Sequence, residues 1–191
     1  MSKAGKLTVI VGSMFSGKST ELQRQGRRKE LAGELVAYFK PRKDNRYTPT
    51  AISTHDGTKV AAYVVEDAQS IREVLKQVEQ QVGLVGTVCI DEIQFFDEKI
   101  VAVVNLLLWD GIDVVCSGLD LDRFAQPFGK VPELLCMAEE VVKVRAVCHS
   151  CGEDAWVSAG TFISEEQIVV GESDKYVPLC RTCYFKKGGI I

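Results

Sequence analysis

Eight residues near the amino terminus have the spacing of a phosphate-binding loop. The run Gly12-Ser13-Met14-Phe15-Ser16-Gly17-Lys18-Ser19 matches G-x-x-x-x-G-K-[ST] without a gap. Its glycines permit a tight turn whose backbone N–H groups face phosphate oxygens, and the amino end of a following helix adds positive partial charge. The motif predicts that Lys18 reaches the β- and γ-phosphates of ATP and that Ser19 binds Mg²⁺.

Two carboxylates follow a short apolar run farther along the chain. Asp91 and Glu92 come directly after Val88-Cys89-Ile90. An acid at such a strand end holds Mg²⁺ in phosphate-loop proteins, usually through water, so Asp91 is the predicted ligand. Glu92 lies within reach of a substrate hydroxyl near the γ-phosphate and suits a general base, with Lys18 as the second predicted catalytic residue. The alternative is a strand end that merely turns polar at the surface, which the phosphate loop disfavours.

Four of the seven cysteines form two C-x-x-C pairs in the last quarter of the chain, Cys148/Cys151 and Cys180/Cys183. They supply four soft ligands, enough to close a tetrahedral site, which predicts a structural zinc ion rather than a catalytic one. A redox dithiol and a site of three cysteines with His149 are the alternatives. The other three cysteines stand singly in apolar segments, as small core residues do.

Short apolar runs alternate with helical stretches through the first three quarters of the chain. We expect strands over 7–11, 35–40, 60–65, 87–91, 113–117 and 141–147, helices over 18–32, 70–81 and 98–109, and a polar loop over 41–57. This alternation predicts an α/β fold of the P-loop (RecA-like) type, with a mostly parallel sheet and helices on both faces.

The pattern changes at Cys148 to glycines, short strands and paired cysteines. We therefore predict two domains, an ATP-binding core over 1–147 and a small zinc-anchored lid (lasso) domain over 148–191.

The bulk composition limits the partners. The 191 residues are 46% hydrophobic and 26% charged, with a formal net charge of −3. This is the composition of a globular protein, and it offers no basic field for a long polyanion, so we expect no nucleic-acid partner. No signal-peptide pattern and no apolar run near the ~20 residues of a membrane span is present, so we expect a cytoplasmic protein with no membrane partner.

Several motifs in order resemble one family, the zinc-containing thymidine kinases. They are GSMFSGKSTEL at 12–22, a charged loop KDNRY at 43–47, DEIQFF at 91–96, PFG at 127–129, DKY at 174–176 and the two C-x-x-C pairs. The resemblance covers residues 6 to about 187, and the combination is far more specific than the phosphate loop alone.

The resemblance implies transfer of the γ-phosphoryl group of ATP to the 5′-hydroxyl of thymidine. It assigns Glu92 as the base and places Gln94 in a second ATP-contacting segment, with Asp44 and Arg46 near the Mg²⁺ and the phosphates. Met14, Phe95 and Phe128 match positions that line the base pocket. The lid is expected to close over the thymine mainly through backbone groups of Gln167, Ile168, Val169, Val170, Gly171 and Tyr176. Such kinases are commonly tetramers and are often inhibited by thymidine triphosphate.

Two departures from the family pattern concern the base pocket. Many relatives carry L-D-x-D-F-R where this chain has Leu119-Asp120-Leu121-Asp122-Arg123-Phe124. Either Phe124 moves by one position to make the substrate contact, or that contact is missing. Relatives also carry T-x-R where this chain has Ser158-Ala159-Gly160.

Two further functions are compatible with a phosphate loop, since this core fold serves several of them. One is a nucleic-acid-stimulated ATPase whose zinc ribbon grips DNA, which the acidic composition disfavours. The other is a non-catalytic nucleotide-binding regulator, in which Glu92 would be idle.

Overall fold

A six-stranded parallel sheet forms the centre of the chain. The computed structural model describes residues 3–42, 51–53, 59–161 and 175–188. The strand order is β5-β2-β6-β7-β1-β8, and every neighbouring pair is parallel. In chain order the strands are β1 (Leu7–Val11), β2 (Val36–Pro41), β5 (Tyr63–Val65), β6 (Thr87–Ile90), β7 (Asp113–Gly118) and β8 (Glu140–Lys143). Parallel strands bring their carboxyl ends to one edge, and the segments after β1, β6 and β7 meet there.

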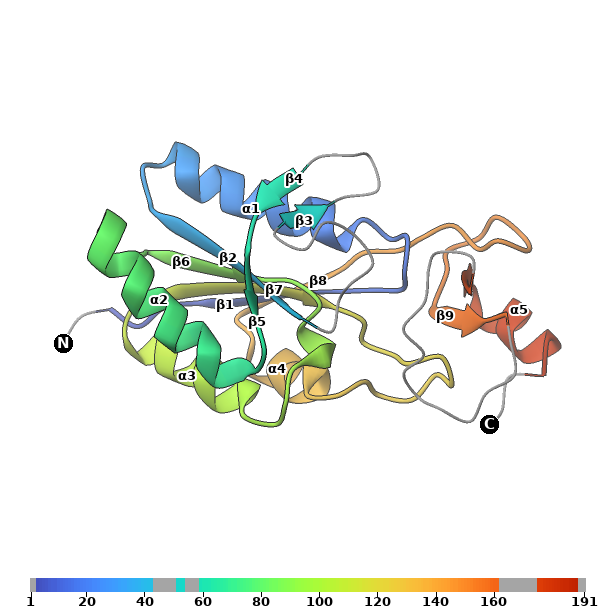
Figure 1. Cartoon of the computed structure of the whole chain (residues 1–191). Helices are drawn as coiled ribbons and strands as arrows, with labels where there is room; N and C mark the ends of the chain where they lie inside the picture. Colours follow the sequence, from blue (N-terminus) through green and yellow to red (C-terminus); the bar gives the residue numbers. More distant parts are fainter. Residues whose placement is uncertain (1–2, 43–50, 54–58, 162–174, 189–191) are drawn as a thin grey trace.

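Helices cover both faces of this sheet, as predicted (Figure 1). α1 (Lys18–Leu31) lies on one face, and α2 (Ala68–Val82), α3 (Ile100–Trp109) and α4 (Val131–Met137) lie on the other. The alternation within β1 explains the two layers. Leu7, Val9 and Val11 join the core under α2–α4, whereas Ile10 joins Leu22 of α1 on the opposite face.

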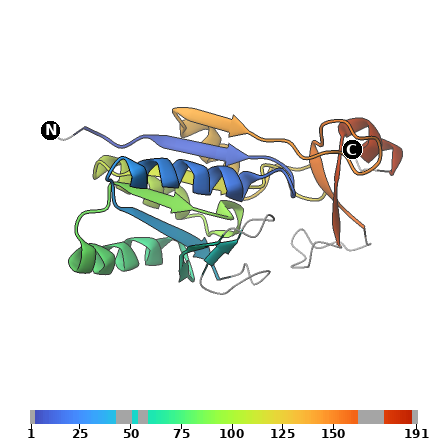
Figure 2. The same ribbon diagram turned by 90° about the horizontal axis from the view of Figure 1, so that it is seen from above.

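The carboxyl-terminal segment forms a small module beside the carboxyl ends of the sheet strands (Figures 1 and 2). Antiparallel strands β9 (Val157–Gly160) and β10 (Tyr176–Leu179) are followed by the short helix α5 (Arg181–Lys186). Its own buried cluster consists of Cys148, Val157, Ala159, Leu179 and Tyr184. We call residues 148–161 and 175–188 the cysteine module.

Most predicted elements are confirmed to within about two residues, and the differences have local causes. The predicted loop over 41–57 contains β3 (Ala51–Ser53), which pairs with β4 (Lys59–Ala61). The single extended run expected over 60–65 is therefore wrong, because β4 and β5 belong to different sheets.

The last strand of the large sheet ends at Lys143, four residues before the predicted end. The sequence did not indicate α4 and α5, whose seven and six residues are too short to show helical periodicity. Among the described residues, no helix has the length and apolarity needed to cross a bilayer.

Candidate active site and cysteine cluster

The phosphate loop connects β1 to α1, as its motif requires. Gly12 has a φ of +151°, and a Cβ there would lie 2.1 Å from the backbone oxygen of Val144, so only glycine fits. Lys18 is only 8% exposed, and its ammonium group donates a hydrogen bond to the backbone oxygen of Ser13 at 2.8 Å. A buried ammonium over the loop is in reach of phosphate bound to the loop's N–H groups.

Ser19 and Asp91 are brought into direct contact, although 72 positions separate them in the sequence. The Ser19 hydroxyl donates to Oδ2 of Asp91 at 2.9 Å, while Oδ1 accepts from the Ser117 hydroxyl and from the backbone N–H of Glu92. Burial, and next the charge of Glu92, raise the pKa of Asp91 to about 6. Because a buried carboxylate is stabilised by a nearby cation, and hydroxyl and carboxylate oxygens are ligands that Mg²⁺ accepts, the pair fits a magnesium site.

Glu92 lies next to Asp91 in a strained conformation. Its φ of 51° and ψ of 44° are left-handed, which costs an L-residue of order 1 kcal/mol. The side-chain N–H of Gln94 donates to Oε2 of Glu92, while Oε1 of Gln94 accepts from the backbone N–H of Leu119 at 3.0 Å. Gln94 is 3% exposed and is thus a buried bridge between the ends of β6 and β7. A Cβ on Gly118 would lie 2.5 Å from Gln94 Oε1, so a glycine makes room for this amide.

Two of the aromatic residues predicted to line the base pocket are in contact. The rings of Phe95 and Phe128 meet edge to face, with centroids 5.8 Å apart. Phe96 is buried in the core, while Phe95 is partly exposed, so the two neighbouring rings have different surroundings, as expected.

Phe124 contacts its neighbour Arg123, whose guanidinium carbon lies 4.7 Å from the centre of the ring. The same guanidinium group packs against Gly160 of β9, where a Cβ would lie 3.5 Å from it. The two departures from the family pattern are therefore adjacent in space, and the arginine at 123 fills the space that the glycine at 160 leaves open.

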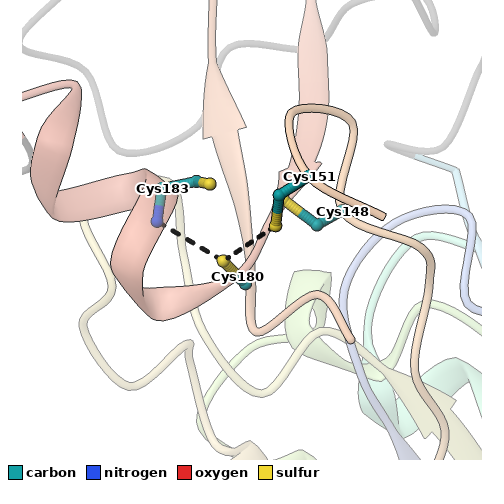
Figure 3. A group of neighbouring side chains, drawn as sticks. All are labelled: Cys148, Cys151, Cys180 and Cys183. Atoms are coloured by element: carbon teal, nitrogen blue, oxygen red, sulfur yellow. Dashed lines mark hydrogen bonds between the residues drawn. The ribbon is translucent and has the colours of Figure 1, made fainter. Parts of the chain in front are cut away.

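The four paired cysteines converge where the segment before β9 meets the start of α5 (Figure 3). Their sulfur atoms all lie within 4.8 Å of one another, and those of Cys151 and Cys180 are 3.6 Å apart. Tetrahedral Zn–S bonds of about 2.3 Å place sulfurs about 3.8 Å apart, so the cluster fits a zinc ion. All seven cysteines, each within the described part of the chain, are free thiols.

The ionisation of the cluster agrees with a cation site. Burial opposes ionisation of Cys148, but hydrogen bonds from backbone N–H groups outweigh it and lower the pKa of this thiol to about 6. Hydrogen bonds with Cys151 and Cys180 raise the pKa of Cys183 to about 12. Thiolates this close repel one another until a metal neutralises them.

Several predicted site residues lie outside the described residues, namely Asp44, Arg46, Gln167, Ile168, Val169, Val170 and Gly171. Tyr176 is described and pairs with Gly160 across β9 and β10.

Two serines make contacts in the site that the sequence did not indicate. Ser117, fully buried, contacts Asp91, and its place as a polar residue closing a buried strand could have indicated it. Ser158 stands out in the sequence only as part of the departure from T-x-R, and nothing there indicates that its hydroxyl accepts a hydrogen bond from the N–H of Met14 in the phosphate loop.

The family model described as "Thymidine kinase" matches residues 5–184. A thymidine kinase of Porphyromonas gingivalis is 44% identical over 96% of this chain and 87% of its own length. One of Pseudothermotoga lettingae is 40% identical over 96% of each chain. Among solved structures, the replication initiator DnaA bound to AMPPCP and single-stranded DNA matches at 17% identity with a TM-score of 0.45, covering 74% of this chain and 40% of that one. A likeness this weak has no bearing on function.

Proposed function

Because the chain belongs to the thymidine kinase family, whose members transfer phosphate from ATP to thymidine, we propose that the residues at the carboxyl ends of β1 and β6 carry out this transfer. The observation that supports the proposal most is the 2.9 Å hydrogen bond between Ser19 and Asp91. It joins the phosphate loop to the strand end that carries Glu92, so a γ-phosphoryl group in the loop would lie beside a carboxylate base.

Phosphoryl transfer depends mainly on positioning and charge neutralisation. The loop N–H groups and Lys18 would bind the β- and γ-phosphates and stabilise charge as it moves toward the leaving oxygen. Ser19 and Asp91 would hold Mg²⁺, which when bound neutralises negative charge on the phosphates. Asp44 and Arg46 are proposed to assist near the same phosphates.

Glu92 is proposed as the general base. Its carboxylate would accept the proton of the 5′-hydroxyl while the thymidine oxygen bonds to the γ-phosphorus. The bond from that phosphorus to the β,γ-bridging oxygen breaks at the same time, and ADP leaves with the electron pair. The buried amide of Gln94 would hold the Glu92 carboxylate in place during this step, since it donates to one oxygen.

The thymine is proposed to bind between Met14, the Phe95–Phe128 pair and Phe124 on one side and the lid on the other. The lid would comprise 167–171 and Tyr176, tethered by zinc on the four cysteines. We also propose the domain boundary at 147/148, because the core strand β8 ends at Lys143 and the cluster of the cysteine module begins with Cys148. A homotetramer, inhibition by thymidine triphosphate and a cytoplasmic location remain proposals that rest on the family resemblance and on the cysteine usage.

A direct assay tests this function against the ATPase alternative. ADP release by the purified protein is measured with ATP and Mg²⁺, adding thymidine in one arm and single-stranded DNA in the other. We expect thymidine-dependent ADP release with one thymidine monophosphate formed per ADP. Stimulation by DNA alone, without a phosphorylated nucleoside, would overturn the proposal.

A further inference from the structure

One peptide group of the phosphate loop is held from both sides. The carbonyl oxygen of Ser13 accepts a hydrogen bond from the Lys18 ammonium at 2.8 Å. The N–H of the same peptide, that of Met14, donates to the hydroxyl oxygen of Ser158 at 2.7 Å. Ser158 is 4% exposed and lies in β9, so this contact joins the cysteine module to the loop across 144 positions of sequence.

We propose that Ser158 is a positioning residue for phosphoryl transfer, which fixes the Ser13–Met14 peptide and through it the ammonium group of Lys18. A carbonyl that accepts from a cation polarises its peptide, so that the N–H on the other side becomes a stronger donor. The hydrogen bond to Ser158 and that from Lys18 therefore reinforce each other. Ser158 and Lys18 are 4% and 8% exposed, so water competes little with either side chain for these bonds.

The position of the Ser158 hydroxyl is itself set by the cysteine module. Ser158 pairs with Pro178 across β9 and β10, and the backbone oxygen of Pro178 accepts from the N–H of His149 at 2.9 Å. His149 follows Cys148 directly, so the strand pair is tied to the cysteine cluster. Strand pairing and the hydrogen bond from His149 thereby connect the cysteine cluster to the strand that carries Ser158.

Two further contacts hold the same module against the core. The Tyr184 hydroxyl donates to the backbone oxygen of Arg123 at 3.3 Å, and the Arg123 side chain packs against Gly160. Through these contacts the segment after β7 holds α5 and β9 against the core. The Ser158 hydroxyl reaches the phosphate loop itself through its hydrogen bond with the N–H of Met14, so a substitution at Ser158 cuts the coupling.

The inference rests on the proposed function, because it concerns the nucleotide that the loop would bind. A serine with a merely structural role would change stability but leave nucleotide affinity unchanged. A serine that acted only on the nucleoside would change the KM for thymidine alone. The experiment therefore measures nucleotide binding without thymidine, in addition to turnover.

The test uses the full, zinc-loaded chain with Ser158→Ala, Ser158→Thr and the control Thr161→Ala. Thr161 lies just after β9, and its hydroxyl bonds to the backbone oxygen of Lys175 at 3.2 Å. Affinity for a non-hydrolysable ATP analogue is measured by calorimetry, together with kcat, both KM values and zinc content. Loss of one hydrogen bond predicts that Ser158→Ala weakens analogue binding about three- to tenfold and lowers kcat. Ser158→Thr, which keeps the hydroxyl, should restore both, and Thr161→Ala should match the parent chain.

A double-mutant cycle with Lys18→Ala tests whether Ser158 acts through the lysine. We expect Ser158→Ala to weaken analogue binding less in the Lys18→Ala background than in the parent, because the two residues share one peptide. Unchanged analogue affinity in Ser158→Ala at normal zinc content, or an effect confined to the thymidine KM, would overturn the inference. Thymidine phosphorylation by the parent chain is measured separately, so failure of the proposed function is recognised independently.

Discussion

Replacing Gln94 by leucine removes both hydrogen bonds of its buried side-chain amide, and their loss is expected to affect stability and turnover in different ways. Gln94 donates to the carboxylate of Glu92 and accepts from the backbone N–H of Leu119 at 3.0 Å. Leucine has a similar volume but makes neither bond, so the N–H of Leu119 is left buried and unpaired. Such a group costs about 1–3 kcal/mol, which corresponds to a fall in Tm of about 2–12 °C for a chain of this size.

The effect on turnover follows from the freed carboxylate. Glu92 keeps its chemistry but loses the donor that orients it, and a misplacement of about 1 Å costs on the order of 10²-fold. We expect the kcat of Gln94→Leu to fall about 10- to 100-fold, with little change in the KM for ATP. Glu92→Gln, which removes the base, should cost more, about 10²–10⁴-fold.

The assay is steady-state ADP release with thymidine, run beside thermal unfolding for each variant. If Gln94 affects turnover only through Glu92, the double variant Glu92→Gln/Gln94→Leu should be scarcely slower than Glu92→Gln alone. A Gln94→Leu variant that loses stability but keeps a kcat within about threefold of the parent would contradict this role of Gln94. Losses of kcat from the two single substitutions that multiply in full in the double variant would contradict it as well.

Three further outcomes are expected. Lys18→Ala should abolish detectable phosphoryl transfer while the thermal transition stays intact, because the Lys18 ammonium group contacts the phosphate loop and is not part of the hydrophobic core. Retained activity would contradict this. Freshly purified protein should contain one zinc per chain by elemental analysis, and Cys180→Ser should lose the metal and weaken thymidine binding most, with a smaller loss of ATP binding through β9. If backbone groups of the lid read the thymine edge, deoxycytidine leaves two groups unpaired and should lose about 30- to 10⁴-fold in kcat/KM, and discrimination below about tenfold would argue against such recognition.

The local motifs of this chain could be interpreted without a structure. A phosphate loop needs its glycines, lysine and serine at fixed spacing between a strand and a helix, so one short segment of sequence is enough to identify it. The same is true of Asp91 and Glu92 at a strand end and of the paired cysteines. Short apolar runs that alternate with helical stretches likewise predicted the parallel sheet, because strands buried on both faces are continuous apolar runs.

The partners of the isolated polar residues were decided only by the tertiary structure. Nothing near Ser158 in the sequence indicates that its hydroxyl meets the N–H of Met14, since the two are 144 positions apart. Contacts between residues far apart in the sequence also produce the bridge that Gln94 makes between β6 and β7 and the packing of Arg123 on Gly160. Secondary-structure propensity and the periodicity of apolar residues report only on neighbours a few positions apart. Which hydroxyl or amide satisfies which buried N–H is instead determined by strand order and by the approach of the cysteine module to the sheet edge.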